Sequence, residues 1–358
     1  MFQTLSLSVL LLIFAGAAAA IWVAGIQLSD TTDVLSMRLG LGEALGGLIL
    51  LAIATNLPEI AITATAALAN DLGIAIGNIL GGIAIQTVVL AVLDAVGVRG
   101  RRPLTYQAAS LTLVLEGALV IAVVVVAIGA SRLPASLIVA RVAPGGLLIA
   151  VLWVVGIWLL GKARTGLPWH EQGDAPDSQP EPRGVAMVMK EKTASEQGRS
   201  TTRTALVFAA AALVTLAGGV ALEQSGEAIA GHIGLSGVLF GATVLAAATS
   251  LPELSTGLAS VRLGDYQLAV SDIFGGNAFL PVLFLLASLL SGQAVLPLAQ
   301  DTDIFLTALG ALLTAVYLFG LIFRPGRRVL RMGVDSLVVL CLYAIGLAGL
   351  FAIAHGQT

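Results

Sequence analysis

Long apolar runs, separated by short polar segments, recur along nearly all of the 358 residues. Most are about twenty residues or longer, the length that an α-helix needs to cross roughly 30 Å of hydrocarbon. The pattern predicts ten membrane-spanning helices, at residues 5–27, 39–69, 72–96, 106–129, 142–161, 204–224, 235–262, 266–291, 300–322 and 334–354. The first run has no basic segment before it, so we expect a retained helix rather than a signal peptide.

Composition agrees with a polytopic membrane protein. Hydrophobic residues make up 58% of the chain and charged residues 11%, against about 45–50% and 25% in soluble domains. The mean hydropathy is +0.98. Basic residues occur only as clusters between the apolar runs, so we expect no nucleic-acid partner.

Two of the apolar runs carry almost the same hexapeptide, ATNLPE at 54–59 and ATSLPE at 248–253. The likeness continues without a gap at a constant offset of 194 residues, from Leu45 and Leu239 to Gly82 and Gly276. Self-similarity at a fixed offset indicates an internal duplication.

The basic residues predict how the chain is oriented. Sixteen of the 18 lysines and arginines fall in the segments that follow odd-numbered runs, so both termini are expected outside and the linker 162–203 in the cytoplasm. That linker is rich in Pro, Gly, Gln and charge, which is typical of a flexible segment.

The number of predicted spans sets the relative orientation of the two copies in the membrane. Five spans separate the first copy from the second, so the copies enter the membrane in opposite directions. The fold class expected is therefore an all-α polytopic membrane protein, whose ten transmembrane helices form two inverted five-helix repeats with broken helices. We assign the repeats to 1–161, with its motif at 45–91, and to 204–358, with its motif at 239–285.

Proline predicts where the helices break. Pro58 has no N–H to donate to the carbonyl of Ala54, and Pro252 has none for Ala248. Free carbonyls at membrane depth are tolerated only where they are buried in protein or face a watery cavity, and a cation there can take them as ligands. Transporters built from inverted repeats place their substrate sites at such breaks near the midplane.

A hydroxyl and a carboxylate share one helix face in each copy. Thr55 and Glu59 are four residues apart, as are Thr249 and Glu253. Hard oxygen ligands of this kind suit Na⁺, Ca²⁺ or Mg²⁺. The alternative is a kinked helix in which a protonated glutamate bonds a neighbour, but two carboxylates at matching depth are costly to keep without a function.

The helix after each motif carries a second polar stripe. With a spacing of four residues, one face holds Asn78, Gly82 and Gln86 in the first copy, and Asp272, Gly276 and Leu280 in the second. The glycines suit close helix packing as well as a site. Asp272 either faces the cation path or lies at a wet helix end.

At these residues the chain resembles the cation/Ca²⁺ exchanger superfamily, the sodium/calcium exchangers and their prokaryotic relatives. Their repeats read approximately GTSLPEL followed by GNxxGSNxxN; here the copies are ATNLPEI with GNILGGIAIQ and ATSLPEL with SDIFGGNAFL. The resemblance implies cation antiport, with Glu59 and Glu253 as principal ligands. The other implied ligands are Thr55, Asn56, Thr249, Ser250, Asn78, Gln86, Asp272 and Asn277.

Departures from the family pattern bear on the ion. Family serines are replaced by Asn56, Gly82 and Gly276, and Gln86 replaces an asparagine. Leu280 stands where one family copy often has Asp or Asn, and Asp272 replaces the Asn of the GN pair.

The sequence thus favours a secondary antiporter that exchanges Ca²⁺ against Na⁺ in a bacterial inner (plasma) membrane. H⁺-coupled Ca²⁺ or Na⁺ antiport is an alternative, because burial favours a neutral, protonated glutamate, and a cation channel is a more remote one. An enzyme is not expected, because the three histidines lie away from the acids. The partners expected are small inorganic cations (Ca²⁺, Na⁺ or H⁺) and the lipid bilayer, without a cofactor; a monomer is compatible with the sequence.

Overall fold

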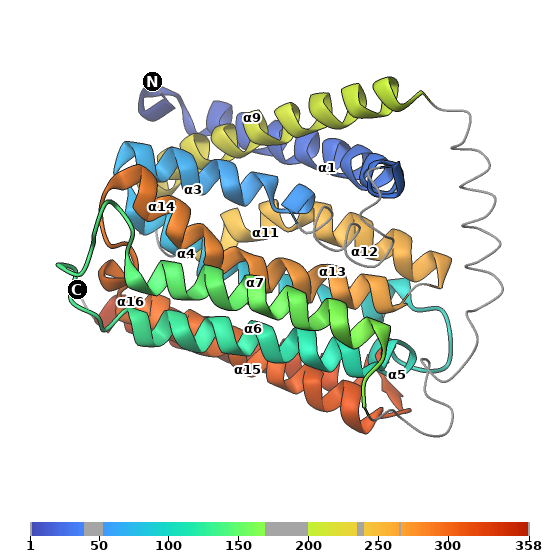
Figure 1. The fold of residues 1–358 in the computed structure, drawn as a ribbon. Coiled ribbons are helices and arrows are strands. Elements are labelled where there is room, and N and C mark those ends of the chain that lie inside the picture. The colour runs from blue at the N-terminus through green and yellow to red at the C-terminus, as the bar shows by residue number, and fades with distance from the viewer. Residues whose placement is uncertain (1, 39–52, 169–199, 235–239, 265, 357–358) are drawn as a thin grey trace.

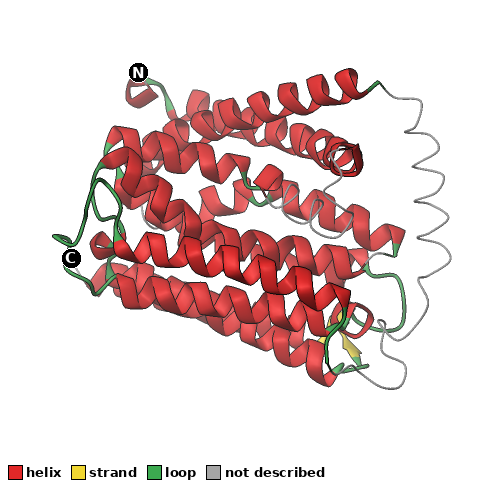
Figure 2. Ribbon diagram, viewed as in Figure 1, coloured by secondary structure: helices red, strands yellow, loops and turns green. Residues whose placement is uncertain are grey.

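The computed structural model describes residues 2–38, 53–168, 200–234, 240–264 and 266–356. Helices lie side by side in one bundle, with a single short hairpin of strands at one end (Figure 2). The helices are α1 (Leu7–Arg38), α3 (Leu57–Ala69), α4 (Leu72–Val92), α5 (Leu104–Ala108), α6 (Leu111–Ala130), α7 (Pro144–Thr165), α9 (Thr201–Ile233), α11 (Ala246–Thr249), α12 (Leu251–Leu263), α13 (Tyr266–Phe279), α14 (Leu283–Ser291), α15 (Asp301–Phe323) and α16 (Val334–Gly356).

Shorter elements join them. Single turns are η1 (Phe2–Thr4), η3 (Leu93–Gly97), η5 (Gly241–Leu245), η6 (Leu280–Val282) and η7 (Leu296–Leu298), and the strands are β1 (Arg328–Val329) and β2 (Met332–Gly333). The strands pair antiparallel, with Val329 opposite Met332. The fold is mostly helical, and this hairpin is its one departure from the expected all-α class within the described residues.

Eight of the described helical segments are long and apolar enough to cross a membrane. They match eight of the ten predicted spans: Leu7–Leu28, Leu72–Gly97, Leu111–Ala130, Pro144–Ala163, Thr201–Ile233, Tyr266–Ser291, Asp301–Phe323 and Val334–Ile353. The other two predicted spans, 39–69 and 235–262, begin in segments outside the described residues. Their described parts include the short helices α3, α11 and α12, so the count of ten stays a prediction.

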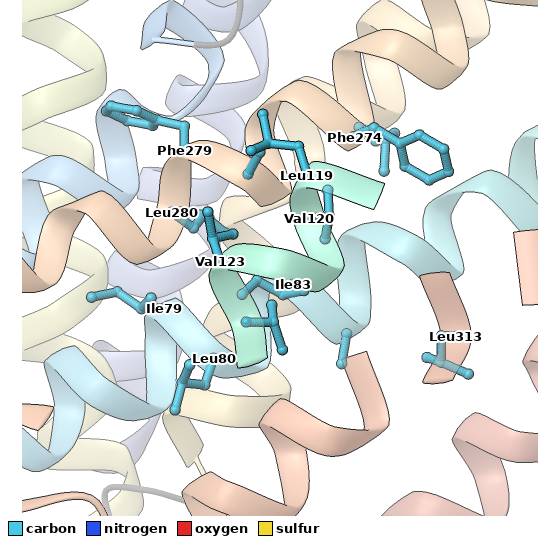
Figure 3. Packing of buried hydrophobic residues seen from close by; sticks show 14 of the residues in the cluster. Ile79, Leu80, Ile83, Leu119, Val120, Val123, Phe274, Phe279, Leu280 and Leu313 are labelled. Atoms are coloured by element: carbon cyan, nitrogen blue, oxygen red, sulfur yellow. The ribbon is translucent and has the colours of Figure 1, made fainter. Parts of the chain in front are cut away.

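Apolar packing divides the bundle into two parts. The main core lies between α4, α6, α13 and α15, where Ile83, Val120, Phe274 and Leu313 are buried (Figure 3). The long helices α1 and α9 pack along each other at one face of the bundle (Figure 1). Their buried side chains, including Ile21 and Leu222, form separate clusters. Within the described residues, the α1–α9 pair therefore takes no part in the main core, and it shares its clusters with side chains of α3, α4 and α11.

The same tight turn occurs at opposite ends of the bundle (Figure 1). Before α7, Val139 bridges to Val142 across Ala140 and Arg141, whose φ angles are 50° and 64°. Before α16, β1 and β2 are joined by a two-residue turn at 330–331, with φ angles of 52° and 71°. Two successive residues with positive φ define a hairpin turn whose twist matches that of the flanking strands.

Asp94, in η3, joins four elements at the end that carries β1 and β2. Its Oδ1 accepts the Leu104 N–H at 2.9 Å, and its Oδ2 accepts the Gly333 N–H at 2.6 Å and the Ser336 hydroxyl at 2.8 Å. The Arg328 guanidinium donates to the Asp94 carbonyl at 2.9 Å. A fully buried carboxylate is tolerable here because three donors satisfy it.

Asp94→Ala should lower the free energy of unfolding by at least about 2 kcal/mol, because each buried donor left without a partner costs about 1–3 kcal/mol. The measurement is the thermal unfolding midpoint of the detergent-purified protein. As a control, Asp301→Ala removes an exposed aspartate and should change stability by less than about 0.5 kcal/mol. Equal shifts in the two variants would contradict this role for Asp94.

Candidate cation site

The two predicted helix breaks are confirmed. Asn56 precedes α3 with φ −88° and ψ 14°, and Ser250 separates α11 from α12 with φ −80° and ψ 5°. Both lie in the sparsely populated bridge region of the backbone map. Pro58 and Pro252 occupy the first turn of the helix that follows, where a missing N–H costs nothing. The LPE sequence thus ends one helical segment and begins another.

The helices that start at these breaks point in opposite directions. From the middle of the bundle, α3 runs toward one end and α12 toward the other (Figure 1). Each spans 13 residues and ends at a left-handed residue, Asn70 with φ 63° and Gly264 with φ 84°. Their N-termini therefore both lie in the interior, which places Glu59 and Glu253 in the first turn of their helices. The helix dipole favours a negative charge at that position.

All ten candidate ligands are buried, none more than 3% exposed. They come from four segments: the two breaks, α4 and α13. The set comprises Thr55, Asn56, Glu59, Asn78, Gln86, Thr249, Ser250, Glu253, Asp272 and Asn277. The wet-end alternative for Asp272 is wrong, because this side chain lies within the packed bundle.

Carboxylates of the first break and of α13 interact with the glutamate of the second break. Glu59 and Asp272 both act electrostatically on Glu253, and Glu59 interacts with Thr249 of the opposite break. The Thr249 hydroxyl itself donates to the Ala246 carbonyl at 3.2 Å. Residues far apart in the chain thus meet as the duplicated motif predicts.

Gln86 of α4 connects the two breaks. Its side-chain nitrogen lies 3.3 Å from Glu253 Oε1 and 3.4 Å from Asn56 Oδ1. Both are long hydrogen bonds, and the amide N–H₂ supplies one hydrogen to each acceptor. Gly276 of α13 makes room for them, since a Cβ there would lie 3.0 Å from Asn56 Nδ2 and 3.2 Å from Gln86 Oε1.

Asp272 has a hydrogen-bond partner on the helix that follows the second break. Its Oδ2 accepts the Thr256 hydroxyl at 2.6 Å. Within the described ranges, no three acidic, histidine or cysteine side chains stand close enough to hold one metal ion together. The interaction of Asp272 with Glu253 is electrostatic.

Several buried oxygens near the breaks accept no hydrogen bond from any residue that the structure describes. They include both carboxylate oxygens of Glu59, Oε2 of Glu253 and Oε1 of Gln86. The Oδ1 atoms of Asn78 and Asn277 likewise accept no hydrogen bond from the described residues. Buried polar atoms are nearly always satisfied in native proteins, so a group of exceptions requires a reason. Oxygens of this type are ligands for Na⁺ and Ca²⁺.

Four further polar residues of these helices were not among the sequence candidates. Thr256 holds Asp272, and Thr87 accepts from the Asn277 amide at 3.0 Å. Thr63 and Ser271 are buried, and their hydroxyls have no described hydrogen-bond partner. Thr63 lies four residues after Glu59, so the spacing that selected Thr55 would also have found it.

A protein-family model matches most of the chain. The model is described as sodium/calcium exchanger protein, and it covers residues 9–162 and 203–352. Among curated relatives, the inner membrane protein YrbG of Escherichia coli (strain K12) is 26% identical over 309 residues, which are 85% of this chain and 86% of YrbG.

Two solved exchangers share the fold. The H⁺/Ca²⁺ exchanger CAX superposes with a TM-score of 0.67 at 14% identity, over 96% of this chain and 82% of CAX. The sodium-calcium exchanger NCX_Mj, soaked with Na⁺ and Sr²⁺, superposes with a TM-score of 0.62 at 16% identity, over 96% of this chain and 99% of the other. At such identities the likeness concerns the fold alone.

Proposed function

Because the chain belongs to the sodium/calcium exchanger family, a family of membrane cation exchangers rather than enzymes, we propose that it is a secondary antiporter that exchanges Ca²⁺ against Na⁺. The observation that carries this proposal is a group of buried oxygens, Glu59 foremost, around two opposed helix breaks; these oxygens have no well-aligned donor among the described residues. Glu59 and Glu253 would be the principal ligands. Thr55, Thr249 and Ser250 would add hydroxyl or carbonyl oxygens.

The proposal includes two inverted five-helix repeats, 1–161 and 204–358, joined by a cytoplasmic linker at 162–203. Support comes from features that recur in both halves: the two breaks, the two left-handed helix ends and the two hairpin turns at opposite ends. Packing recurs as well, since α1 packs on α12 while α9 packs on α3. The ten spans, with both termini outside a bacterial inner membrane, follow from the same scheme.

Alternating access would arise from movement of the α1–α9 pair against the remaining helices. The main core contains no described side chain of α1 or α9, which supports such a division. Two contacts join it to the breaks: Gly25 of α1 lies against Pro252, and Gly219 of α9 lies against Pro58. Gly219 follows Gly25 by 194 positions, and Pro252 follows Pro58 by the same number, so the duplication relates the two contacts. A shift of α1 and α9 would thus change both breaks at once.

H⁺-coupled exchange is the second candidate, and the sparse ligand set favours it. Ca²⁺ takes about 6–8 oxygen ligands. Glycine at 82 and 276 and leucine at 280 remove three side chains that offer oxygen in the family pattern. A site with fewer oxygens suits an ion that takes fewer ligands than Ca²⁺. A carboxylate in such a site can bind a cation and a proton in turn.

Reconstituted vesicles separate the candidates. We expect Ca²⁺ uptake when an outward Na⁺ gradient is imposed at equal pH, and uptake that stops when the Na⁺ gradient is removed. Acidifying both sides should slow uptake, because protons compete with the cation for the two carboxylates. Uptake that follows only a pH gradient would replace Na⁺ by H⁺ as the coupling ion. Flux that neither saturates nor shows counter-transport would indicate a channel.

A further inference from the structure

The two halves of the site differ in whether the glutamate accepts a hydrogen bond from a neighbouring side chain, and we propose that the Gln86 amide causes this difference. In this proposal Gln86 competes with the transported cation for Glu253, rather than serving as a ligand. The inference rests on the proposed function, and it assigns to Gln86 the opposite role from the one that the family resemblance implies.

The hydrogen bonds give Gln86 the role of donor. Its Nε2 faces a carboxylate oxygen of Glu253 and the side-chain oxygen of Asn56, on two different helical segments. Both partners are acceptors, so the amide must turn its N–H₂ group toward them. A cation bound between these two oxygens would need the space that this nitrogen occupies.

In the other half, the residue that corresponds to Gln86 is not a donor. The position that corresponds to Gln86 at the offset of 194 residues is Leu280, which is apolar and fully buried. Its Cδ1 lies 3.0 Å from where a Cβ of Gly82 would be, so it fills the space beside α4. Neither oxygen of Glu59 has a donor in good hydrogen-bond geometry within the described ranges, because the nearby Thr249 hydroxyl donates instead to the Ala246 carbonyl. The Glu59 half is therefore the one open to a cation.

Local packing is built around the glutamine. A Cβ at 276 would lie 3.0 Å from Asn56 Nδ2 and 3.2 Å from Gln86 Oε1, which is tighter than an ordinary van der Waals contact. Glycine at this position therefore makes room for the Gln86 amide. The long amide at 86 and the glycine at 276 form a matched pair that holds the N–H₂ group against Glu253.

Gln86→Met tests this role, because methionine keeps the length and removes the donor. Binding of radioactive Ca²⁺ and, separately, Na⁺ to the purified full chain should become about tenfold tighter, since the cation no longer has to displace two hydrogen bonds. Gln86→Asn, whose amide is one methylene shorter, should give a smaller gain in the same direction. Gln293→Met is the matched control: this exposed glutamine also donates to an asparagine oxygen, that of Asn70 at 2.6 Å, and should leave affinity unchanged.

The opposite result would overturn the inference. Binding that weakens in both Gln86 variants would make the glutamine a ligand through Oε1, and unchanged binding would make it a packing residue. Glu59→Gln is included to keep the two proposals apart. If it abolishes binding while the Gln86 variants behave as wild type, only the competitor role fails. If the wild-type protein binds neither Ca²⁺ nor Na⁺, both the proposed cation site and the competitor role of Gln86 are wrong.

Discussion

Glu59→Gln should abolish exchange, with a fall in the initial rate of more than about 100-fold, since even groups that only support a metal ligand cost about 10–100-fold when removed. Glutamine keeps the size of the side chain but removes the charge. The lost charge matters here because neither Glu59 oxygen has a well-aligned donor among the described residues, whereas Glu253 Oε1 accepts a hydrogen bond from Gln86. Glu253→Gln should also reduce the rate by more than tenfold. The measurement is the cation flux into vesicles of each variant, reconstituted at equal protein density.

Glu227→Gln provides the control for this pair. Glu227 lies on α9, is exposed, and carries the same charge. Its replacement should change the flux less than twofold. If Glu59→Gln and Glu253→Gln both transported normally, the assignment of the cation site to the helix breaks would be wrong, whatever the ion.

Gly219→Ala should reduce turnover about tenfold, because overpacking a close contact costs about 1–3 kcal/mol. A Cβ at this position would lie 3.0 Å from the Pro58 carbonyl oxygen and 2.9 Å from the Ala61 side chain. The carbonyl belongs to the backbone and cannot turn aside. Gly25→Ala should act in the same way, since its Cβ would lie 2.9 Å from the Pro252 ring. Both changes should affect the maximal rate and spare the binding of the cation at equilibrium.

The same helices provide controls. Gly16 of α1 and Gly231 of α9 have nothing within 4 Å of an added Cβ. Gly16→Ala and Gly231→Ala should therefore transport at the wild-type rate. A loss of turnover in these variants as well would trace the effect to helix stiffness, and would remove the reason for placing the moving contact at the prolines.

The general plan of this molecule was accessible from the sequence because it depends on local signals. Apolar length predicted ten spans, of which eight match described helices long and apolar enough to cross a membrane, and proline predicted both breaks. The duplicated motif also brought together Glu59 and Glu253, which are far apart in the chain. Each of these inferences needs only the chemistry of a short segment and its repetition.

Side-chain partnerships were not accessible in this way. The sequence offers both Gln86 and Asp272 as candidate ligands, yet one donates to Glu253 and the other accepts from Thr256. Asp94 gave no signal at all, because its donors come from segments more than 200 residues further on as well as from Leu104 nearby. Such roles depend on which atoms meet after folding. Motif and spacing do not contain that information.

The pairing of α1 with α9 has a consequence for how the protein is made. The ribosome completes α1 long before it reaches Thr201, where α9 begins. Until then the face of α1 that carries Leu10 and Ile21 lacks the partner that buries it in the finished bundle. An N-terminal fragment that ends before α9 should therefore remain sensitive to membrane quality control. Supplying α9 on a separate chain should rescue it.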